Sequence, residues 1–275
     1  MWHNATCFLT LFIFFIRLLL YLQSKSQAMI REIQNHRSIR NYKPEPISPE
    51  VLEKVLLAGT RASTTGNMQV YSMIVTTDTL LKEKLWEAHF KQDMVKKAPV
   101  HITFCADFNR FNKWCQQRNA EPGYNNFLSF FTGAIDALLA SQNVCLEAEA
   151  HGLGICYLGT ATYNADKIID ILELPGGVVP VAAIAMGYPE DHPGLTDRLP
   201  MEAVVHQEKY REFSPERIDA IYEERENSDQ TLELLKINEL ESLAKIFTEK
   251  RYTKKDNEFF SGKFLEVIRK QGFLG

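Results

Sequence analysis

The pattern of apolar and polar positions alternates between helical and strand-like segments over most of the chain. A helix is expected to begin at Pro49, because Ser48 suits the N-cap, proline suits the first helical position, and apolar residues follow at helical spacing. Residues 71–76 and 101–106 are short runs bounded by turn or loop residues, which is typical of strands. Residues 178–186 are almost continuously apolar and predict a central, buried strand.

The longest helical pattern covers residues 132–151. Apolar side chains occupy most of its circumference rather than one stripe, and Gly152 is well placed to end it. A helix that is apolar on all sides has to be buried, so we expect it either in the core of a domain or between two subunits.

Length and composition narrow the possible functions. A chain of 275 residues fits one large domain or two small ones. Its 31 basic residues are balanced by 35 acidic ones, which disfavours nucleic-acid binding. The five cysteines form no Cys-x-x-Cys pair and the seven histidines show no metal-ligand spacing. We therefore expect reduced thiols in a cytoplasmic protein, with no disulfide framework and no metal site.

Residues 1–28 form a separate N-terminal extension. Residues 8–22 are mostly apolar, but they fall short of the roughly 20 residues that a bilayer needs, and Arg17 adds a charge near their middle. A secretory signal would need a basic start, which is missing. Three interpretations remain open: upstream sequence translated before a natural start at Met29, a signal peptide, or a membrane anchor.

Five short polar motifs are spread through the rest of the chain. They are residues 36–42, 63–69, 105–110, 152–159 and 197–200. Each alone has a plain explanation, such as a solvated basic turn or a loop between two elements. In this order and at these intervals they resemble the flavin-binding segments of the nitroreductase superfamily. The motif at residues 105–110 resembles its NADPH-dependent oxygen-insensitive nitroreductase and flavin reductase branch.

The resemblance runs from about residue 30 to the C-terminus and implies an α+β fold of three layers. A mainly antiparallel sheet would be flanked by helices, and two chains would intertwine into a homodimer built on the long helix of residues 132–151. One FMN-binding domain would then cover residues 29–275, with a helical extension at its C-terminal end.

The resemblance also implies where FMN would bind. This cofactor has an anionic phosphate at one end and, once reduced, negative charge near N1 and O2 of its ring. His36, Arg37 and Ser38 would serve the phosphate and ribityl end, and Arg40 would stabilise the reduced ring, since arginine keeps its charge and binds two oxygens at once. Arg198 would be a second phosphate ligand, although the acidic residue before it departs from the family pattern.

Other segments would complete the site. The loop of residues 63–69 would reach the flavin of the partner subunit, Gln92 would bind the pyrimidine edge of the ring, and the backbone N–H of Gly159 would contact N5. Arg40 and Gly159 are thus the expected catalytic positions. The full set implied around FMN is His36, Arg37, Ser38, Arg40, Ser63, Thr65, Asn67, Gln92, Tyr157, Leu158, Gly159, Thr160 and Arg198.

A basic stretch near the C-terminus is where this branch binds the 2′-phosphate of NADPH. The candidates are Lys250, Arg251, Lys254 and Lys255. Their spacing diverges from that of the branch, and a solvated loop explains them equally well. NADPH is therefore the expected co-substrate and NADH the alternative.

The expected function is that of an FMN-dependent oxidoreductase. By resemblance, NAD(P)H would reduce FMN by hydride transfer to N5, and a nitroaromatic, a quinone or free flavin would then accept the hydride in a ping-pong cycle. The sequence shows no nucleophile with a paired base, which agrees with a cofactor that carries the chemistry.

Two alternatives stay open: a non-catalytic flavin-binding protein for storage or sensing, and a flavin-dependent dehalogenase or flavin-fragmenting enzyme. Small molecules and a second copy are the expected partners, with a membrane only if residues 1–28 are an anchor.

Overall fold

The structure is a computed structural model that describes residues 29–274. The interpretations of residues 1–28 concern a part of the chain outside this range. The chain divides into two units, of which the first ends at His36 and includes the short helix α2 (Arg31–Gln34), and the second begins at Arg37. Among residues 29–274, none of the helices is long and apolar enough to cross a membrane.

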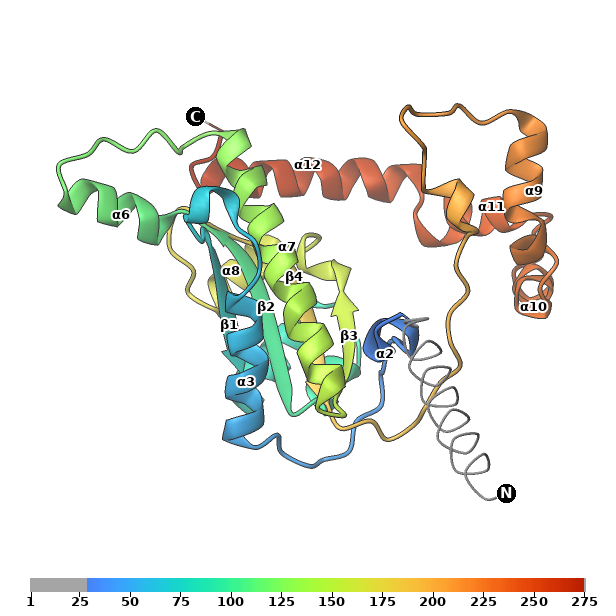
Figure 1. Ribbon diagram of the computed structural model, residues 1–275, viewed down its shortest axis with the longest axis horizontal. Coiled ribbons are helices and arrows are strands. Elements are labelled where there is room, and N and C mark those ends of the chain that lie inside the picture. Colours follow the sequence, from blue (N-terminus) through green and yellow to red (C-terminus); the bar gives the residue numbers. More distant parts are fainter. Residues whose placement is uncertain (1–28, 275) are drawn as a thin grey trace, which may run out of the picture. The chain divides into compact units, whose positions relative to one another are not determined.

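Within the second unit, four described strands form one antiparallel sheet in the order β1-β2-β4-β3 (Figure 1). The strands are β1 (Tyr71–Thr76), β2 (Val100–Asp107), β3 (Gly154–Leu158) and β4 (Val178–Gly187). The strands predicted at residues 71–76, 101–106 and 178–186 are confirmed. The last of them is central, as expected from its continuous apolar run.

The two central strands of the sheet are almost entirely buried. All residues of β2 are buried, and so are those of β4 apart from Val181, which is half-buried. β4 contains Pro180, which has no N–H for a regular ladder. It pairs with Cys105, beside the register shift that separates Cys105 from Phe104. An irregularity in the central pair thus coincides with the proline.

One face of the sheet is covered by α3 (Pro49–Thr60) and α7 (Phe127–Ala150). The predicted start of α3 is confirmed, with Ser48 Oγ accepting the N–H of Val51 at 3.3 Å. The predicted long helix is also confirmed, but it begins earlier, because Asn126 caps it through the N–H of Ser129. The two helices pack closely enough that a Cβ on Gly59 would lie 2.7 Å from Val144.

The expectation that the long helix is buried on all sides is not met within one chain. Its sheet-facing residues are buried, whereas a second face carries large apolar side chains that stay exposed: Phe127, Leu128, Phe131, Ile135, Leu138 and Leu139. Burial of this face between subunits stays a prediction.

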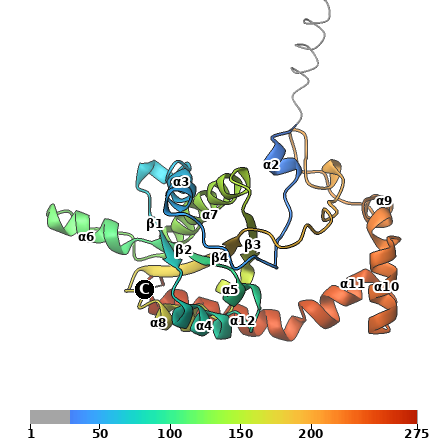
Figure 2. The same cartoon turned by 90° about the horizontal axis from the view of Figure 1, so that it is seen from below.

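The other face of the sheet is covered by α4 (Thr79–Ala88), α5 (Met94–Lys97) and α8 (Ala165–Ile171), as Figure 2 shows. The three layers of the expected α+β fold are therefore present. The short 3-10 helices are η1 (Thr65–Asn67), η2 (Gly159–Ala161) and η3 (Met201–Ala203).

The remaining helices lie at the periphery of the second unit. α6 (Asn109–Gln117) follows β2, and the C-terminal part of the chain forms α9 (Pro215–Glu226), α10 (Asp229–Asn238), α11 (Leu243–Lys245), the π-helix η4 (Ile246–Arg251) and α12 (Lys254–Lys270). α12 returns to the core, where Val267 and Ile268 are buried against Phe108 and Phe130. The C-terminal part of the chain is thus helical, and its role as an extension of an FMN-binding domain stays a prediction.

The residues after His36 extend the sheet at its β3 edge. Ser38 bridges Ile155 in parallel, and the N–H of Ile39 donates to the carbonyl of Ile155 at 2.9 Å. The buried Ile39 side chain fills the space in front of Gly154, where a Cβ would lie 2.5 Å from its Cγ1. The Ile39 side chain can pack here because residue 154 is a glycine and has no Cβ.

A Gly154→Ala substitution should push Ile39 away from β3. We expect a loss of about 1–3 kcal/mol of stability, the usual cost of overpacking, seen as a lower urea midpoint at unchanged slope. Gly123→Ala is the matched control, because a Cβ there would meet no described atom within 4 Å. Equal midpoints for the two variants would contradict this close approach.

Candidate functional site

Two of the expected site residues lie beside β3. Ser38 pairs with this strand, and the charge of Arg40 acts on Cys156 within it. Burial raises the pKa of the Cys156 thiol, and Arg40 together with a hydrogen bond from Ser38 offsets part of that rise. Arg40 itself is exposed. The structure thus presents a permanent cation and a hydroxyl at the same sheet edge.

Tyr42 anchors the segment that contains Ser38 and Arg40. Its buried hydroxyl lies 2.6 Å from the carbonyl oxygen of Ile39 and 3.0 Å from that of Ala185 on β4. Burial raises the pKa of Tyr42 far above its usual range, so it stays a neutral phenol. The backbone that carries Ser38 and Arg40 is consequently held at Ile39 and Tyr42, and the Arg40 side chain is exposed beside it.

A second group forms just beyond the end of β3. Gln92, in the loop between α4 and α5, donates from Nε2 to Thr160 Oγ1 at 3.2 Å and to the carbonyl oxygen of His89 at 3.1 Å. His89 Nδ1 lies 2.7 Å from the same Thr160 oxygen. Gln92 and Thr160, two of the residues expected around FMN, are therefore brought together although they are distant in sequence. His89 was not anticipated.

Gly159 lies at the surface next to Thr160. A Cβ built at this position would have no described heavy atom within 4 Å, so open space adjoins the backbone here. The protein itself would tolerate a side chain, and only a ligand that approaches the main chain closely would require glycine.

Tyr157 and Leu158 have side chains turned into the protein. The Tyr157 hydroxyl lies 2.7 Å from Ser141 Oγ on α7, and Leu158 is buried on the opposite face of the sheet. Burial raises the pKa of Tyr157 beyond its usual range. These two positions therefore offer mainly backbone groups to a ligand.

The loop of residues 63–69 is held by Asp136, which sequence reasoning did not single out. Asp136 is fully buried on α7, and its carboxylate accepts the N–H groups of Thr65 at 3.0 Å and Val70 at 3.4 Å. The loop side chains Ser63, Thr65 and Asn67 are exposed. A carboxylate inside an otherwise apolar helical pattern is the signal that could have revealed this anchor.

The loop lies at the opposite edge of the sheet from the other candidates. It leads into β1, whereas Ser38, Gly159 and Thr160 flank β3, and β2 and β4 stand between those two edge strands. One chain therefore does not bring the loop to the other site residues.

The Arg37 and Arg198 side chains, both expected to bind the FMN phosphate, donate hydrogen bonds to different backbone carbonyls. Arg37 donates to the carbonyl of Pro193 at 2.9 Å, which joins it to the exposed stretch that leads to Arg198. The Arg198 guanidinium donates to the carbonyls of its neighbours Thr196 and Asp197, at 3.2 and 2.8 Å. His36 is the last residue of the first unit.

The basic candidates near the C-terminus lie on two helices. Lys250 and Arg251 end η4, where Arg251 lies 5.6 Å from the centroid of the Phe247 ring. Lys254 and Lys255 begin α12 and are exposed, with Lys254 3.7 Å from Glu258. These contacts are compatible with a solvated cluster as well as with a phosphate site.

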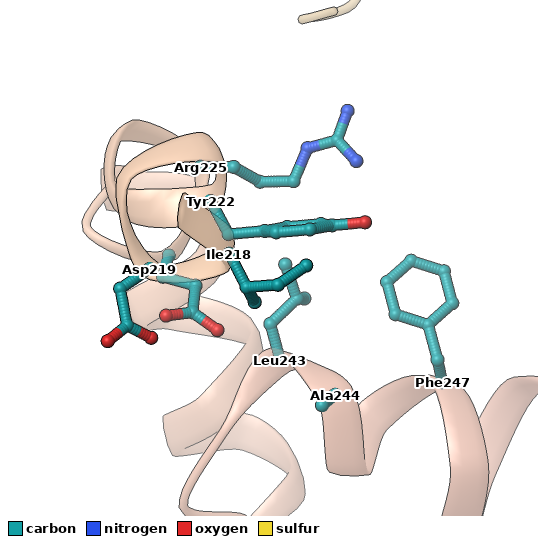
Figure 3. Close-up of a pocket in the computed structure, with 8 residues that line it drawn as sticks. Ile218, Asp219, Tyr222, Arg225, Leu243, Ala244 and Phe247 are labelled. Atoms are coloured by element: carbon teal, nitrogen blue, oxygen red, sulfur yellow. The ribbon is translucent and has the colours of Figure 1, made fainter. Parts of the chain in front are cut away.

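A cavity of about 430 Å³ lies in the C-terminal region (Figure 3). Its apolar floor comes from Ile218 on α9 and from Leu243 and Ala244 on α11, and Tyr222 and Phe247 add aromatic walls. Its lining, as far as the chain is described, includes none of the residues expected around FMN. Separately, residues 29–274 contain no cluster of three or more His, Cys, Asp or Glu side chains that could hold a metal.

His89 lies near a second buried histidine, with the two ring planes tilted by 52°. Its ring centroid lies 5.2 Å from that of His101 on β2, and both side chains are fully buried. Burial lowers the pKa of His89 to about 4, and it lowers the pKa of His101 well below its usual value, with further lowering by His89 and Lys82. Both imidazoles are therefore neutral near pH 7.

Comparison with known proteins identifies the family of this chain. The model of the Nitroreductase family matches residues 33–188, and the chain belongs to that family. It is 35% identical over 190 residues to the oxygen-insensitive NADPH nitroreductase of Salmonella typhimurium, covering 69% of this chain and 77% of that protein. It is 34% identical over 183 residues to the FMN reductase (NADPH) of Bacillus subtilis, covering 66% and 74% respectively.

A solved structure has a higher sequence identity to this chain. The crystal structure of a Bacteroides fragilis protein assigned as an oxidoreductase superposes with a TM-score of 0.88 at 48% identity, over 90% of this chain and all of that one. The expected family and its three-layer fold are confirmed. The roles of the individual site residues stay predictions.

The buried histidines make the fold sensitive to acid. An unfolded histidine takes up a proton near pH 6.5, whereas folded His89 does so only near pH 4. Between these values the unfolded state binds more protons, so stability should fall by about 1.4 kcal/mol per pH unit for each such histidine as pH decreases. Urea unfolding at several pH values measures this slope, and His89→Asn should make it shallower. An unchanged slope in the variant would contradict the assignment.

Proposed function

We propose that this chain is an FMN-dependent oxidoreductase that oxidises NADPH, or alternatively NADH, and reduces a small planar acceptor such as a nitroaromatic, a quinone or free flavin. One observation supports this most: in a nitroreductase-family chain, Ser38 with Arg40 and Gln92 with Thr160 flank β3, and Gly159 beside them adjoins open space. The curated relatives carry names of the same activity.

The donor set suits FMN. Arg40 and Arg37 are permanent cations for anionic oxygens, and Ser38 adds a hydroxyl. Gln92 supplies an amide for the polar edge of the ring, and the open surface at Gly159 accepts a flat molecule against the main chain. Bound FMN would supply the hydride-accepting and hydride-donating N5 atom.

The protein residues would contribute position and charge. Arg40 would stabilise negative charge that develops next to its guanidinium, because this charge is already in place before the reaction. Gly159 would allow the main chain to lie close to the ring. The open surface would admit nicotinamide and acceptor in turn, which fits a ping-pong cycle and a broad range of planar acceptors.

A homodimer is part of this proposal. The exposed apolar face of α7 is of the kind that a soluble chain covers with a partner. The loop of residues 63–69 presents exposed hydroxyl and amide groups at the far edge of the sheet from β3, so it would serve the site of a second copy. A two-fold axis would then complete both sites at once.

The cytoplasm is the proposed location, because the four described cysteines are free thiols.

The activity is tested directly with purified protein. It should carry FMN or bind it one to one, and it should oxidise NADPH at a rate that depends on an added nitroaromatic or quinone. A protein that binds FMN without any acceptor-dependent rate would be a storage or sensing protein. A protein with no FMN affinity would contradict the proposal altogether.

Replacing Arg40 and replacing Arg198 by alanine should change different properties of the protein. Arg198→Ala should weaken FMN binding by about 1.5–3 kcal/mol in both redox states, the usual value of a hydrogen bond to a charged group. Arg40→Ala should lower the flavin midpoint potential and slow reduction by NADPH at saturating FMN, because the reduced ring loses a cation. Arg118→Ala, at the exposed end of α6, is the control. The opposite pattern of effects would reverse the two roles.

The dimer is tested on the exposed face of α7. Leu138→Glu places a charge in the middle of that face and should give monomers that bind FMN poorly. Leu80→Glu is the matched control, because Leu80 is also exposed but lies on α4. Sedimentation velocity measures the oligomeric state. A monomeric wild-type protein that still binds FMN would refute the shared site.

A further inference from the structure

The amide of Gln92 has a defined orientation. One end of it lies 3.1 Å from the carbonyl oxygen of His89, which can only accept a hydrogen bond. That end must therefore be the NH₂ group, and the same nitrogen also donates to Thr160 Oγ1. With both N–H groups of Nε2 in use, the oxygen Oε1 is the end of Gln92 that remains available to a ligand.

His89 supports this orientation from two sides. Its carbonyl accepts from Gln92, and its ring nitrogen Nδ1 lies 2.7 Å from the Thr160 oxygen to which Gln92 also donates. A hydroxyl can donate or accept, so the contact with Nδ1 forms with either neutral tautomer of the ring. Thr160 is thereby fixed between an imidazole and an amide.

The anchor itself is rigid. His89 caps the C-terminus of α4, where its N–H donates to the carbonyl of Leu85, and its side chain is fully buried. The neighbouring carbonyl of Ala88 accepts from Asn164 at 2.7 Å, and Asn164 in turn accepts from Lys263 on α12 at 2.9 Å. The end of α4 is thus tied to the segment before α8 and to α12.

The backbone before Gln92 is strained in a way that serves this contact. Phe90 and Lys91 are consecutive non-glycine residues in the left-handed region, with φ of 54° and 58°. Such residues cost energy and persist only where surrounding contacts hold them. The turn they form leads directly to Gln92, whose side chain binds back to His89 and Thr160.

We propose that His89 is a positioning residue for cofactor binding: through Thr160 and its own carbonyl it holds Gln92 so that Oε1 faces the ligand as a hydrogen-bond acceptor. This rests on the proposed FMN function, and its ligand partner is a donor such as the N3–H of the isoalloxazine. His89 Nε2 is buried with no hydrogen-bond partner among the described residues. The imidazole is therefore poorly explained as a purely structural group.

The test is a double-mutant cycle on FMN affinity. His89→Leu removes the ring nitrogens and keeps a large apolar side chain, and Gln92→Ala removes the amide. Each single variant should raise the FMN dissociation constant by about five- to tenfold, the range of one lost hydrogen bond. The double variant should be no weaker than Gln92→Ala alone, since His89 acts through Gln92. His89→Asn, which can place an amide near the position of Nδ1, should restore most of the affinity.

Urea unfolding of the apoprotein separates positioning from structure. His89→Leu should leave the urea midpoint at pH 7.5 unchanged or higher, because it replaces a desolvated ring by an apolar side chain. Additive losses in the cycle, or wild-type affinity in His89→Leu, would overturn the positioning role while leaving FMN binding intact. If the wild-type protein does not bind FMN, the proposed function fails first and this inference falls with it.

Discussion

The attachment of residues 37–42 to β3 is the contact on which the candidate site depends. Ile39 fills the space in front of Gly154 and donates its N–H to Ile155, and Tyr42 is fixed by carbonyls of Ile39 and Ala185. Without this pairing, Ser38 and Arg40 would be residues of an exposed polar turn. With it, they become fixed features of the same strand that leads to Gly159.

The far end of β3 depends on a different kind of support. Buried polar groups need partners, and Gln92 Nε2, Thr160 Oγ1 and the carbonyl and Nδ1 of His89 supply them to one another there, whereas His89 Nε2 has none among the described residues. Their hydrogen bonds join the loop after α4 to the turn after β3. Because the carbonyl of His89 can only accept, the Gln92 amide has one favourable orientation in this network, and Gln92 becomes a directed acceptor.

The loop of residues 63–69 lies at the opposite edge of the sheet, where it contacts α7. Asp136 is buried in α7 and binds the backbone of the loop of residues 63–69, so the loop is held while its side chains point outward. The same helix exposes its apolar face. A second copy placed on that face is the simplest way to use both features, and the proposed dimer follows from their combination.

The sequence alone determined several of the elements and the family, because these depend on local patterns. Apolar runs predicted three of the strands, Ser48-Pro49 predicted the start of α3, and the motifs containing Ser38, Arg40 and Gly159 indicated the family. Sequence reasoning also selected Gln92, but it could not separate a site residue from an exposed polar one.

Only the tertiary structure decided which side chains meet and how they are oriented. It turned Tyr157 toward Ser141, tied the loop of residues 63–69 to Asp136, and revealed His89 as the partner of Thr160. Asp136 and His89 belong to no motif, since their value lies in burial and in partners 60 or more residues away. Residue spacing carries no record of such contacts, because they arise when separate elements pack against one another.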